Sequence, residues 1–367
     1  MNTHIKVSVI LPSLNVAKYI EECVRSAINQ TLQDIEIICV DAGSTDGTLE
    51  ILRQLAQQDS RIKLLHSPVK SYGAQMNMGF RRAQGEFLAI LETDDYILPE
   101  MYQELYAIAQ ENNLDFVKSD FERFRGEEDN RVFAYASVYH TDWYDKVINP
   151  LENIDVFEAV MNTWTGLYRM EFLKKYNIIH NETPGASYQD NGFWFQTFIY
   201  AERMMFVNKA YYKLRRDNAN SSVHSKGKIY TIYDEYDFIE KIVRSNREME
   251  KKFIAIFHKK KYDNCIYHYD RISQEFRKEY LDRMHSEFKA ASQMGELDKE
   301  VFGETKWKIL QTIVSSPDRY YRLTNNKYSK KLYASLVKVH TLWNYVRKYG
   351  IVATVNKVSD KARKKKL

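Results

Sequence analysis

Short apolar runs alternate with amphipathic helical segments between residues 5 and 120 of this 367-residue chain. The runs read as strands and begin at Val7, Ile35, Ile62, Phe87 and Phe116. Helical spacing, with apolar residues at i and i+3 or i+4, covers 17–29, 48–57, 74–83 and 99–111. Because parallel strands need crossover connections that cover both faces of their sheet, this order predicts an α/β fold with a mainly parallel central sheet flanked by helices.

The second run ends at Asp41, which precedes a turn of small residues that opens a helix. In an open α/β sheet, ligands bind beyond the carboxyl ends of the strands. Such a turn lets backbone N–H groups approach a ligand closely, and Asp41 can accept from a base N–H or a ribose hydroxyl. Helix capping by Ser44 or Asp46 is the simpler interpretation of those two residues, and for Asp46 we prefer it.

The fourth run breaks off into three carboxylates within four residues, Glu92, Asp94 and Asp95. Carboxylates this close repel one another and lose hydration unless a cation or water satisfies them. Hard oxygen ligands suit Mg²⁺ or Mn²⁺, so a divalent cation is expected here. An Asx-type turn followed by a helix N-cap before Pro99 is the alternative.

Five segments in order resemble the family 2 glycosyltransferases of GT-A fold, and a second set extends the resemblance over residues 5–223. The first set is Val9–Ser13 with Asn15 and Tyr19, Val40–Thr48, Asn77–Gly79, Ala83–Phe87 and Glu92–Asp95. The second set is Thr165–Arg169 with Phe172 and Leu173, Tyr188–Phe193, and Tyr211–Tyr212 with Arg215 and Arg216. Neither a GxGxxG dinucleotide motif nor a P-loop is present.

This resemblance implies an inverting transfer of a hexosyl or N-acetylhexosaminyl group from a nucleotide diphosphate, preferably UDP, to a hydroxyl. The acceptor would be a saccharide or lipid-linked saccharide of a lipopolysaccharide, capsule or exopolysaccharide. By resemblance, Asp41 contacts the uracil or ribose, and Glu92 and Asp94 lie in the DXD motif that holds Mn²⁺ or Mg²⁺, with Asp94 the preferred ligand. Asp190 matches the general base that takes the acceptor proton. The whole nucleotide-sugar set is Pro12, Asp41, Tyr72, Gln75, Asn77, Thr93 and Asp94.

Some positions depart from the family pattern. Glu92 stands in place of the first Asp of the DXD motif, and Ala42 in place of the second Asp of the preceding turn. Gln189 replaces the Glu of the usual Glu-Asp pair, so Asp190 lacks an adjacent like charge. The segment 70–77 also differs from the family, which usually has an Arg-Asn pair there. We expect Tyr72 or Gln75 to contact the nucleotide. The alternative is that the segment is only the start of an ordinary amphipathic helix.

Further candidates surround the acceptor. Trp164 and Tyr188 can form an aromatic platform for a sugar ring, or they pack in the core. Arg215 and Arg216 are candidates for a diphosphate clamp, although one of them can be merely solvated. His224 is a weaker candidate for the metal, and a surface role is the alternative. For Asp190 the alternative to catalysis is a helix N-cap.

Basic residues concentrate at the C-terminal end. From residue 318 to 367 there are fourteen Lys or Arg and two acids, a charge of +12, so the remainder carries −7 within the total of +5. We predict a GT-A domain over 1–225, with nucleotide-sugar and acceptor halves at 1–120 and 121–225, a helical extension over 226–315 and a basic amphipathic tail over 316–367. Such a tail suits an anionic membrane surface, with about 1 kcal/mol per basic residue. A solvated charged face is the alternative, and no nucleic-acid module is recognisable.

The three cysteines are far apart, outside any CxxC pattern, and no apolar run is long enough to span a bilayer. With no visible signal peptide, the expected location is cytoplasmic, peripheral on the inner face of the membrane, with a homo-oligomer possible. A non-catalytic carbohydrate-binding or scaffold protein on the same fold is the alternative function. A sugar-phosphate or nucleotidyl transferase would need a Gly-rich phosphate signature, which the early part of the chain lacks.

Overall fold

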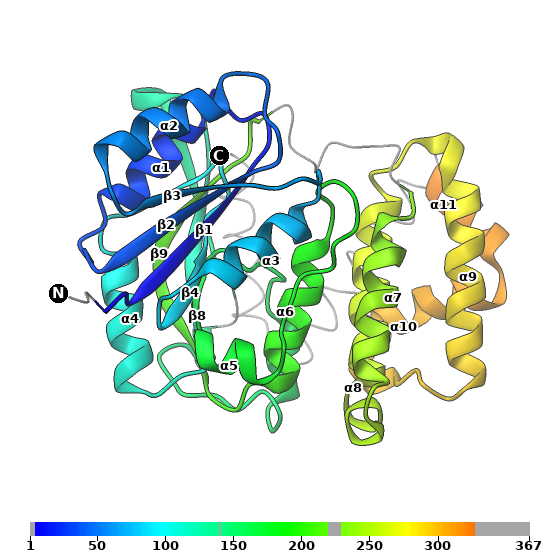
Figure 1. Ribbon diagram of the computed structural model, residues 1–367. Coiled ribbons are helices and arrows are strands. Elements are labelled where there is room, and N and C mark those ends of the chain that lie inside the picture. The colour runs from blue at the N-terminus through cyan, green and yellow to red at the C-terminus, as the bar shows by residue number, and fades with distance from the viewer. Residues whose placement is uncertain (1–3, 139–140, 219–228, 327–367) are drawn as a thin grey trace. The chain divides into compact units, whose positions relative to one another are not determined.

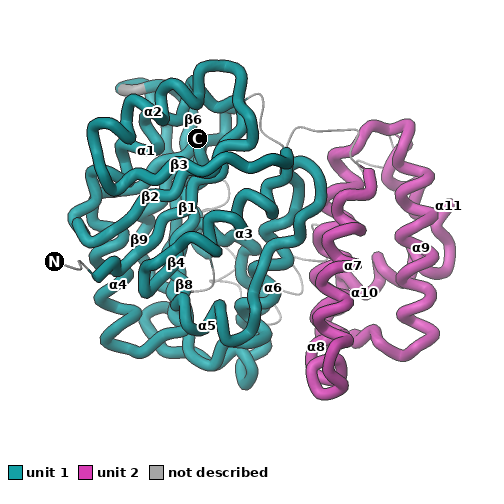
Figure 2. The backbone as a smooth tube through the Cα atoms, in the orientation of Figure 1, with its two compact units in different colours: residues 1–222 teal, residues 223–367 magenta. Residues whose placement is uncertain are grey.

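The computed structural model describes residues 4–138, 141–218 and 229–326. The chain forms two compact units, Met1–Ser222 (unit 1) and Val223–Leu367 (unit 2), which Figure 2 colours separately. No helix in the described ranges is long and apolar enough to cross a membrane.

Unit 1 is built on one mixed sheet with the strand order β3-β2-β1-β4-β8-β6-β9-β5, and β7 pairs with β6 outside this path. The strands are β1 (Val7–Ser13), β2 (Ile35–Asp41), β3 (Ile62–His66), β4 (Phe87–Ile90), β5 (Tyr96–Ile97), β6 (Phe116–Arg125), β7 (Val132–Ala136), β8 (Gly166–Arg169) and β9 (Met204–Arg215). Strands β1 to β4 are mutually parallel, as predicted. Strand β8 runs antiparallel between β4 and β6, while β6 and β9 are parallel.

The helices of unit 1 lie on both faces of the sheet (Figure 1). They are α1 (Ile20–Ile28), α2 (Thr48–Gln58), α3 (Tyr72–Arg82), α4 (Met101–Glu111), α5 (Met170–Lys175) and α6 (Gln189–Tyr200) (Figure 1). Every residue of β1 and β2 is buried, which requires a layer on each side of the sheet. Helix α3 packs directly on β1 and β2. A Cβ on Gly79 of α3 would lie 2.6 Å from Ile10 Cγ2, so this close approach requires glycine.

Helix α1 begins at Ile20, three residues later than predicted. Val16 N donates to Thr48 Oγ1 at 2.9 Å, and Ala17 N donates to Asp46 Oδ2 at 3.0 Å. Asp46 also accepts from Thr48 N at 3.1 Å, at the start of α2. The N-cap of α2 is Gly47, so the capping role that we preferred for Asp46 is wrong; Asp46 instead precedes the cap and ties the loop after β1 to the first residue of α2.

Unit 2 is helical in its described part. Its helices are α7 (Thr231–Val243), α8 (Arg247–Tyr269), α9 (Arg277–Gln293), α10 (Lys299–Ser315) and α11 (Pro317–Asn325). Tyr233 and Tyr236 of α7 are fully buried, and Tyr233 lies against Tyr280 of α9 with ring centroids 5.1 Å apart. These tyrosines are core residues of unit 2. His224 and the predicted tail beyond residue 326 lie outside the described residues.

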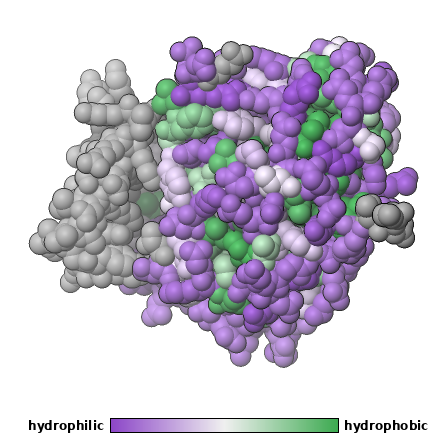
Figure 3. Space-filling model, turned by 90° about the vertical axis from the view of Figure 1, so that its left-hand side faces the viewer, coloured by the Kyte–Doolittle hydropathy of each residue, from purple (hydrophilic) through white to green (hydrophobic). Residues whose placement is uncertain are grey.

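The surface of unit 1 matches this layered arrangement. On the face shown in Figure 3 the surface is largely hydrophilic, and its hydrophobic residues form separate patches. The apolar side chains of β1, β2 and β4 are buried in the core instead. The carboxyl ends of these strands carry the polar residues that the sequence singled out.

Candidate active site

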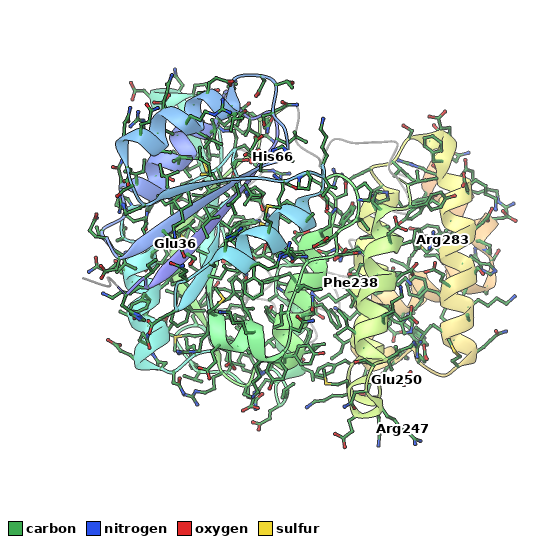
Figure 4. The ribbon with its side chains drawn as sticks, viewed as in Figure 1. Glu36, His66, Phe238, Arg247, Glu250 and Arg283 are labelled. Atoms are coloured by element: carbon green, nitrogen blue, oxygen red, sulfur yellow. The ribbon has the colours of Figure 1, made fainter. Side chains whose placement is uncertain are left out.

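The turn after β2 is shaped by the carboxylate of Asp41. Its Oδ2 accepts from Gly43 N and Ser44 N, both at 2.9 Å, and its Oδ1 accepts from Ser44 Oγ at 2.5 Å. Gly43 has φ +83°, a conformation that glycine adopts readily. In Figure 4, His66 marks the carboxyl end of β3, next to this turn, while Glu36 lies near the opposite end of β2. Asp41 is therefore already hydrogen-bonded within the protein, a role that the sequence did not predict; its contact with uracil or ribose stays a prediction.

The ends of the neighbouring strands are held together by buried side chains. Gln75 Nε2 donates to Ser13 O at 2.9 Å and to Val40 O at 2.6 Å, so it bridges β1 and β2. Thr93 Oγ1 donates to Pro12 O at 3.0 Å and so ties the loop after β4 to the end of β1. These contacts fix the edge of the sheet at the expected nucleotide side. Nucleotide contacts by Gln75, Thr93 and Pro12 remain predictions.

Asn77 connects α3 to the segment that leads toward α6. Its Nδ2 donates to His180 O and to Glu182 Oε1, both at 2.9 Å, and its Oδ1 accepts from His180 N at 2.9 Å. Both ends of the amide thus have protein partners, and only 2% of the residue is exposed. The structure gives Asn77 a structural task; its predicted nucleotide contact stays untested.

The three carboxylates after β4 form an acidic loop, Glu92–Asp95. Tyr72 of α3 donates its hydroxyl to Glu92 Oε1 at 2.7 Å, and Asn218 Nδ2 donates to Asp94 Oδ2 at 2.8 Å. Burial raises the pKa of Glu92 to about 8; the Tyr72 hydroxyl lowers it in part, and the charges of Asp94 and Asp190 raise it further. The loop therefore brings three carboxyl groups together where the sequence predicts a cation, and at a pKa of about 8 the Glu92 carboxyl is mostly protonated at neutral pH.

The acidic loop fits a divalent cation that also binds a ligand's phosphates. Among the residues that the structure describes, no group of three His, Cys, Asp or Glu is arranged to hold a metal ion. Mg²⁺ is usually bound by one or two carboxylates together with substrate phosphates and water, rather than by a complete protein cage. Asp94, which is half-buried, and Glu92 together supply that partial donor set.

Arg215 anchors the acidic loop from β9. Its backbone N donates to Asp95 Oδ1 at 2.7 Å and its Nε to Asp94 O at 3.1 Å, while its guanidinium pairs with Glu22 at 2.9 Å. The side chain is 1% exposed. This burial makes Arg215 a support for the loop and gives no access for a diphosphate, whereas Arg216 is exposed.

Asp190 lies in the first turn of α6. Tyr188 occupies the N-cap position of α6 and makes no side-chain capping bond. Its φ of +66° is uncommon for a residue other than glycine. Gln189 Nε2 donates to Thr183 Oγ1 at 3.0 Å and to Gly185 O at 3.1 Å, so the glutamine that replaces the family's Glu holds the preceding loop. The N-cap residue is Tyr188 and not Asp190, although the Asp190 carboxylate interacts with backbone N–H groups of Asp190 and Asn191 in the first turn; its catalytic role stays a prediction.

The aromatic candidates differ in their surroundings. Trp164 is half-buried and lies against Phe121, with ring centroids 4.8 Å apart, and against Tyr212 at 4.4 Å. Tyr212 in turn donates its hydroxyl to Asp95 Oδ2 at 2.8 Å. Trp164 therefore connects the expected acceptor side with the acidic loop, and enough of it is exposed to contact a ligand. Tyr188 is also half-buried.

Lys118 is a residue of this region that the sequence reasoning missed. It lies on β6, is fully buried, and its Nζ donates to Asn162 O at 2.5 Å and to Tyr168 Oη at 3.3 Å. Burial raises the pKa of Asp190 to about 6, and the positive charge of Lys118 opposes that rise. A lysine directly after the apolar pair that starts this strand was the available sign.

Comparisons with known proteins agree with this architecture. A family model described as "Glycosyl transferase family 2" matches residues 8–192. The uncharacterized glycosyltransferase EpsJ of Bacillus subtilis is 31% identical over 217 residues, which are 59% of this chain and 62% of EpsJ. The glycosyltransferase GlyG of Streptococcus pneumoniae is 31% identical over 214 residues, 57% of this chain and 70% of GlyG. The chain thus spans less than two thirds of the length of EpsJ.

Among solved structures, residues 1–349 of S. aureus TarS superpose with a TM-score of 0.66 at 19% identity, covering 90% of this chain and 91% of that one. TarS has also been solved with UDP-GlcNAc. At this identity the likeness concerns the fold, and it confirms the predicted GT-A type with C-terminal helices.

Proposed function

The chain belongs to glycosyl transferase family 2, and from that premise we propose that it transfers a sugar from a nucleotide diphosphate to an acceptor hydroxyl with inversion at the anomeric carbon. In this proposal the acidic loop serves the diphosphate, and Asp190 serves the acceptor.

One observation supports the proposal most: Tyr72 contacts the acidic loop and also feels the charge of Asp190, although Asp190 lies about 100 positions from that loop in the sequence. Tyr72 donates its hydroxyl to Glu92. Burial raises the pKa of the Tyr72 phenol, and the negative charges of Glu92 and Asp190 raise it further. The charge of Asp190 likewise raises the pKa of Glu92. A carboxylate cluster beside a separate, half-buried carboxylate is what a metal-assisted group transfer with a general base requires.

Asp190 is suited to accept the acceptor's proton. Its pKa of about 6 leaves it mostly ionised at neutral pH while keeping its basicity higher than that of a surface aspartate. The acceptor oxygen would attack the anomeric carbon from the face opposite the diphosphate, giving inversion. Trp164 and Tyr188 would present aromatic faces to the acceptor sugar.

Asp94, assisted by Glu92, would hold Mn²⁺ or Mg²⁺, which supplies Lewis-acid neutralisation of the diphosphate as it leaves. The protein's own contribution is to keep the loop in place: Arg215 and Tyr212 both bind Asp95. The turn at Asp41, together with Tyr72 and Gln75 of α3, would contact the base and ribose of the nucleotide.

The finer assignment follows the sequence and the relatives. We assign UDP as the carrier, in line with the UDP-GlcNAc complex of TarS, and a hexosyl or N-acetylhexosaminyl group as the transferred sugar. The acceptor is a saccharide or lipid-linked saccharide of surface polysaccharide synthesis. The domain limits at residues 225 and 315, and peripheral membrane attachment through the basic tail at the inner face, complete the proposal.

The test measures binding and hydrolysis of UDP-, GDP- and dTDP-sugars by the full chain, with Mn²⁺ and with a chelator. We expect one nucleotide-sugar to bind in a metal-dependent way, and Asp94→Asn to abolish that dependence. Glu50→Gln is the matched control, because Glu50 is an exposed carboxylate of α2 in the same unit, outside the site.

No binding of any nucleotide-sugar in either condition would make the non-catalytic carbohydrate-binding or scaffold function the better explanation. Binding without metal dependence would retain the transferase but remove the assignment of Glu92 and Asp94. Equal loss in Glu50→Gln and Asp94→Asn would point to a general effect of removing charge.

A further inference from the structure

Tyr212 of β9 binds both ends of the acidic loop through one oxygen. Its hydroxyl accepts from Glu92 N at 3.1 Å and donates to Asp95 Oδ2 at 2.8 Å. The residue is 0% exposed, so its ring has a fixed place in the close-packed core of unit 1. Because the two partners flank Asp94, the phenol oxygen sets how the loop presents the carboxylate between them.

Asp95 is the carboxylate of the acidic loop that faces the protein. Its Oδ1 accepts from Arg215 N at 2.7 Å and its Oδ2 from the Tyr212 hydroxyl. Its own backbone N–H donates to Glu92 O at 3.1 Å, and the residue is 2% exposed. Both carboxylate oxygens therefore have partners within the protein, so Asp95 fastens the loop to β9, and the cation would be bound by Asp94 and Glu92.

The ring of Tyr212 lies against Trp164. The two ring centroids are 4.4 Å apart, with 35° between the ring planes. Phe121, which pairs with Tyr212 across β6 and β9, meets the same indole edge-on with centroids 4.8 Å apart. Phe121 is also buried, whereas Trp164 is only half-buried. The two buried rings thus support the indole, and part of it stays accessible to a ligand.

We propose that Tyr212 is a positioning residue for both sides of the active site. Its hydroxyl holds the acidic loop in the geometry that binds the cation and the diphosphate, and its ring supports Trp164, which would carry the acceptor sugar. This inference rests on the proposed function, and it gives the buried Tyr212 no contact with either substrate. A tyrosine that served only core packing could lose its hydroxyl without any effect on cation-dependent binding.

The experiment compares the full wild-type chain with Tyr212→Phe, which keeps the ring, and Tyr212→Leu, which removes both the ring and the hydroxyl. Calorimetry measures UDP binding at several Mg²⁺ concentrations and with a chelator. Without the hydroxyl, Glu92 N and Asp95 Oδ2 lose a buried partner. We expect both variants to bind UDP about fivefold or more weakly than the wild type in Mg²⁺, and the chelator to remove this difference.

The support of Trp164 is measured by acrylamide quenching of tryptophan emission. Trp164→Phe identifies the share of the emission that comes from this residue. Tyr212→Phe should leave that share unchanged, because the ring that contacts the indole remains. Tyr212→Leu should increase the quenching of Trp164 and shift its emission to the red, because one face of the indole loses its neighbour. If Tyr212→Leu does not fold, Tyr212→Met also removes the ring, and the same changes are expected.

Tyr211→Phe is the matched control. Tyr211 is the preceding residue of β9, is also buried, and donates its hydroxyl to Glu104 of α4. Successive residues of a strand point to opposite faces of the sheet. The control variant therefore removes a comparable hydrogen bond to a carboxylate outside the site. Its UDP binding and its Trp164 quenching should match those of the wild type.

A folded Tyr212→Phe that binds UDP in Mg²⁺ as tightly as the wild type overturns the inference, as does an equal loss in Tyr211→Phe. Unchanged accessibility of Trp164 in folded Tyr212→Leu also overturns it. Failure of the proposed function looks different: the wild type would bind UDP equally with Mg²⁺ and with the chelator, and this inference would fall with it. Binding that depends on Mg²⁺, is weakened in Asp94→Asn and is intact in Tyr212→Phe would refute this inference alone.

Discussion

The two halves of unit 1 treat their buried polar groups in different ways. In the parallel half, Gln75, Asp41 and Thr93 hydrogen-bond to neighbouring strand ends and turns. In the half built on β6, β8 and α6, several buried polar atoms have no hydrogen-bond partner among the described residues. They include Asn162 Nδ2, His180 Nε2 and Asn191 Nδ2.

A buried polar atom without a partner is disfavoured by about 1–3 kcal/mol. In the parallel half, these polar side chains already have hydrogen-bond partners within the protein before any ligand binds. The other half keeps buried polar atoms that water or a ligand can satisfy. Variants in each half should accordingly differ in whether they change activity or stability.

Asp190→Asn should give the largest effect and tests the acceptor half. We expect transfer to fall by about 10²–10⁴-fold, because the amide cannot accept the proton, while nucleotide-sugar affinity stays the same. In the wild type, transfer should decline as the pH falls through about 6, since burial raises the pKa of Asp190 to that value and protonation removes the base. Initial rates across pH measure both; an unchanged rate in the variant would remove Asp190 from the chemistry.

Asp94→Asn should give the next largest effect. It tests the acidic loop, which follows β4 of the parallel half and is bound by Arg215 and Tyr212 of β9. Losing one carboxylate from the acidic loop should weaken Mn²⁺-dependent nucleotide-sugar binding by about tenfold or more, because the cation neutralises the diphosphate. Titration calorimetry with and without Mn²⁺ measures the difference. Equal affinity of variant and wild type in Mn²⁺ would show that the cation is held without Asp94.

The parallel half was the easier one to predict. Its strands follow from continuous apolar runs, and each of the four begins at the predicted residue. Strands β1, β2 and β4 are buried along their whole length, whereas β3 is mostly half-buried. Helix starts were less accurate. Helix α3 begins at Tyr72, where Ser71 Oγ accepts from Ala74 N at 3.2 Å, a cap that periodicity alone does not reveal.

The site was predicted as a set of residues, but the tasks of several side chains depend on contacts far apart in the sequence. Asn77 binds His180, 103 positions away, and Arg215 binds Asp94, 121 positions away. No local pattern distinguishes a buried amide that bridges two elements from one that faces a ligand. Lys118 was missed for the same reason, because its partners lie 44 and 50 positions away.

Asn77→Ala tests the parallel half through stability. Removing the amide leaves the backbone N–H and carbonyl of His180 without partners, and we expect unfolding free energy to fall by about 1–3 kcal/mol. Urea denaturation measures this, with Gln58→Ala on the exposed end of α2 as control. Nucleotide-sugar affinity of the folded variant should change little; a selective loss of affinity at full stability would instead support the direct nucleotide contact predicted from the sequence.

Gln189→Glu should give the smallest effect, and it returns the family's usual residue to the acceptor half. The new carboxylate would replace the N–H donors that bind Thr183 Oγ1 and Gly185 O, so the loop before α6 loses two hydrogen bonds. It would also place a like charge next to Asp190 and raise its pKa further. We expect the acidic limb of transfer to move up by less than about one pH unit, with a rate at pH 7 lowered by up to about twofold. A rate above that of the wild type would contradict this prediction. It would mean that a negative charge next to Asp190 increases the transfer rate more than the loss of the loop's hydrogen bonds decreases it.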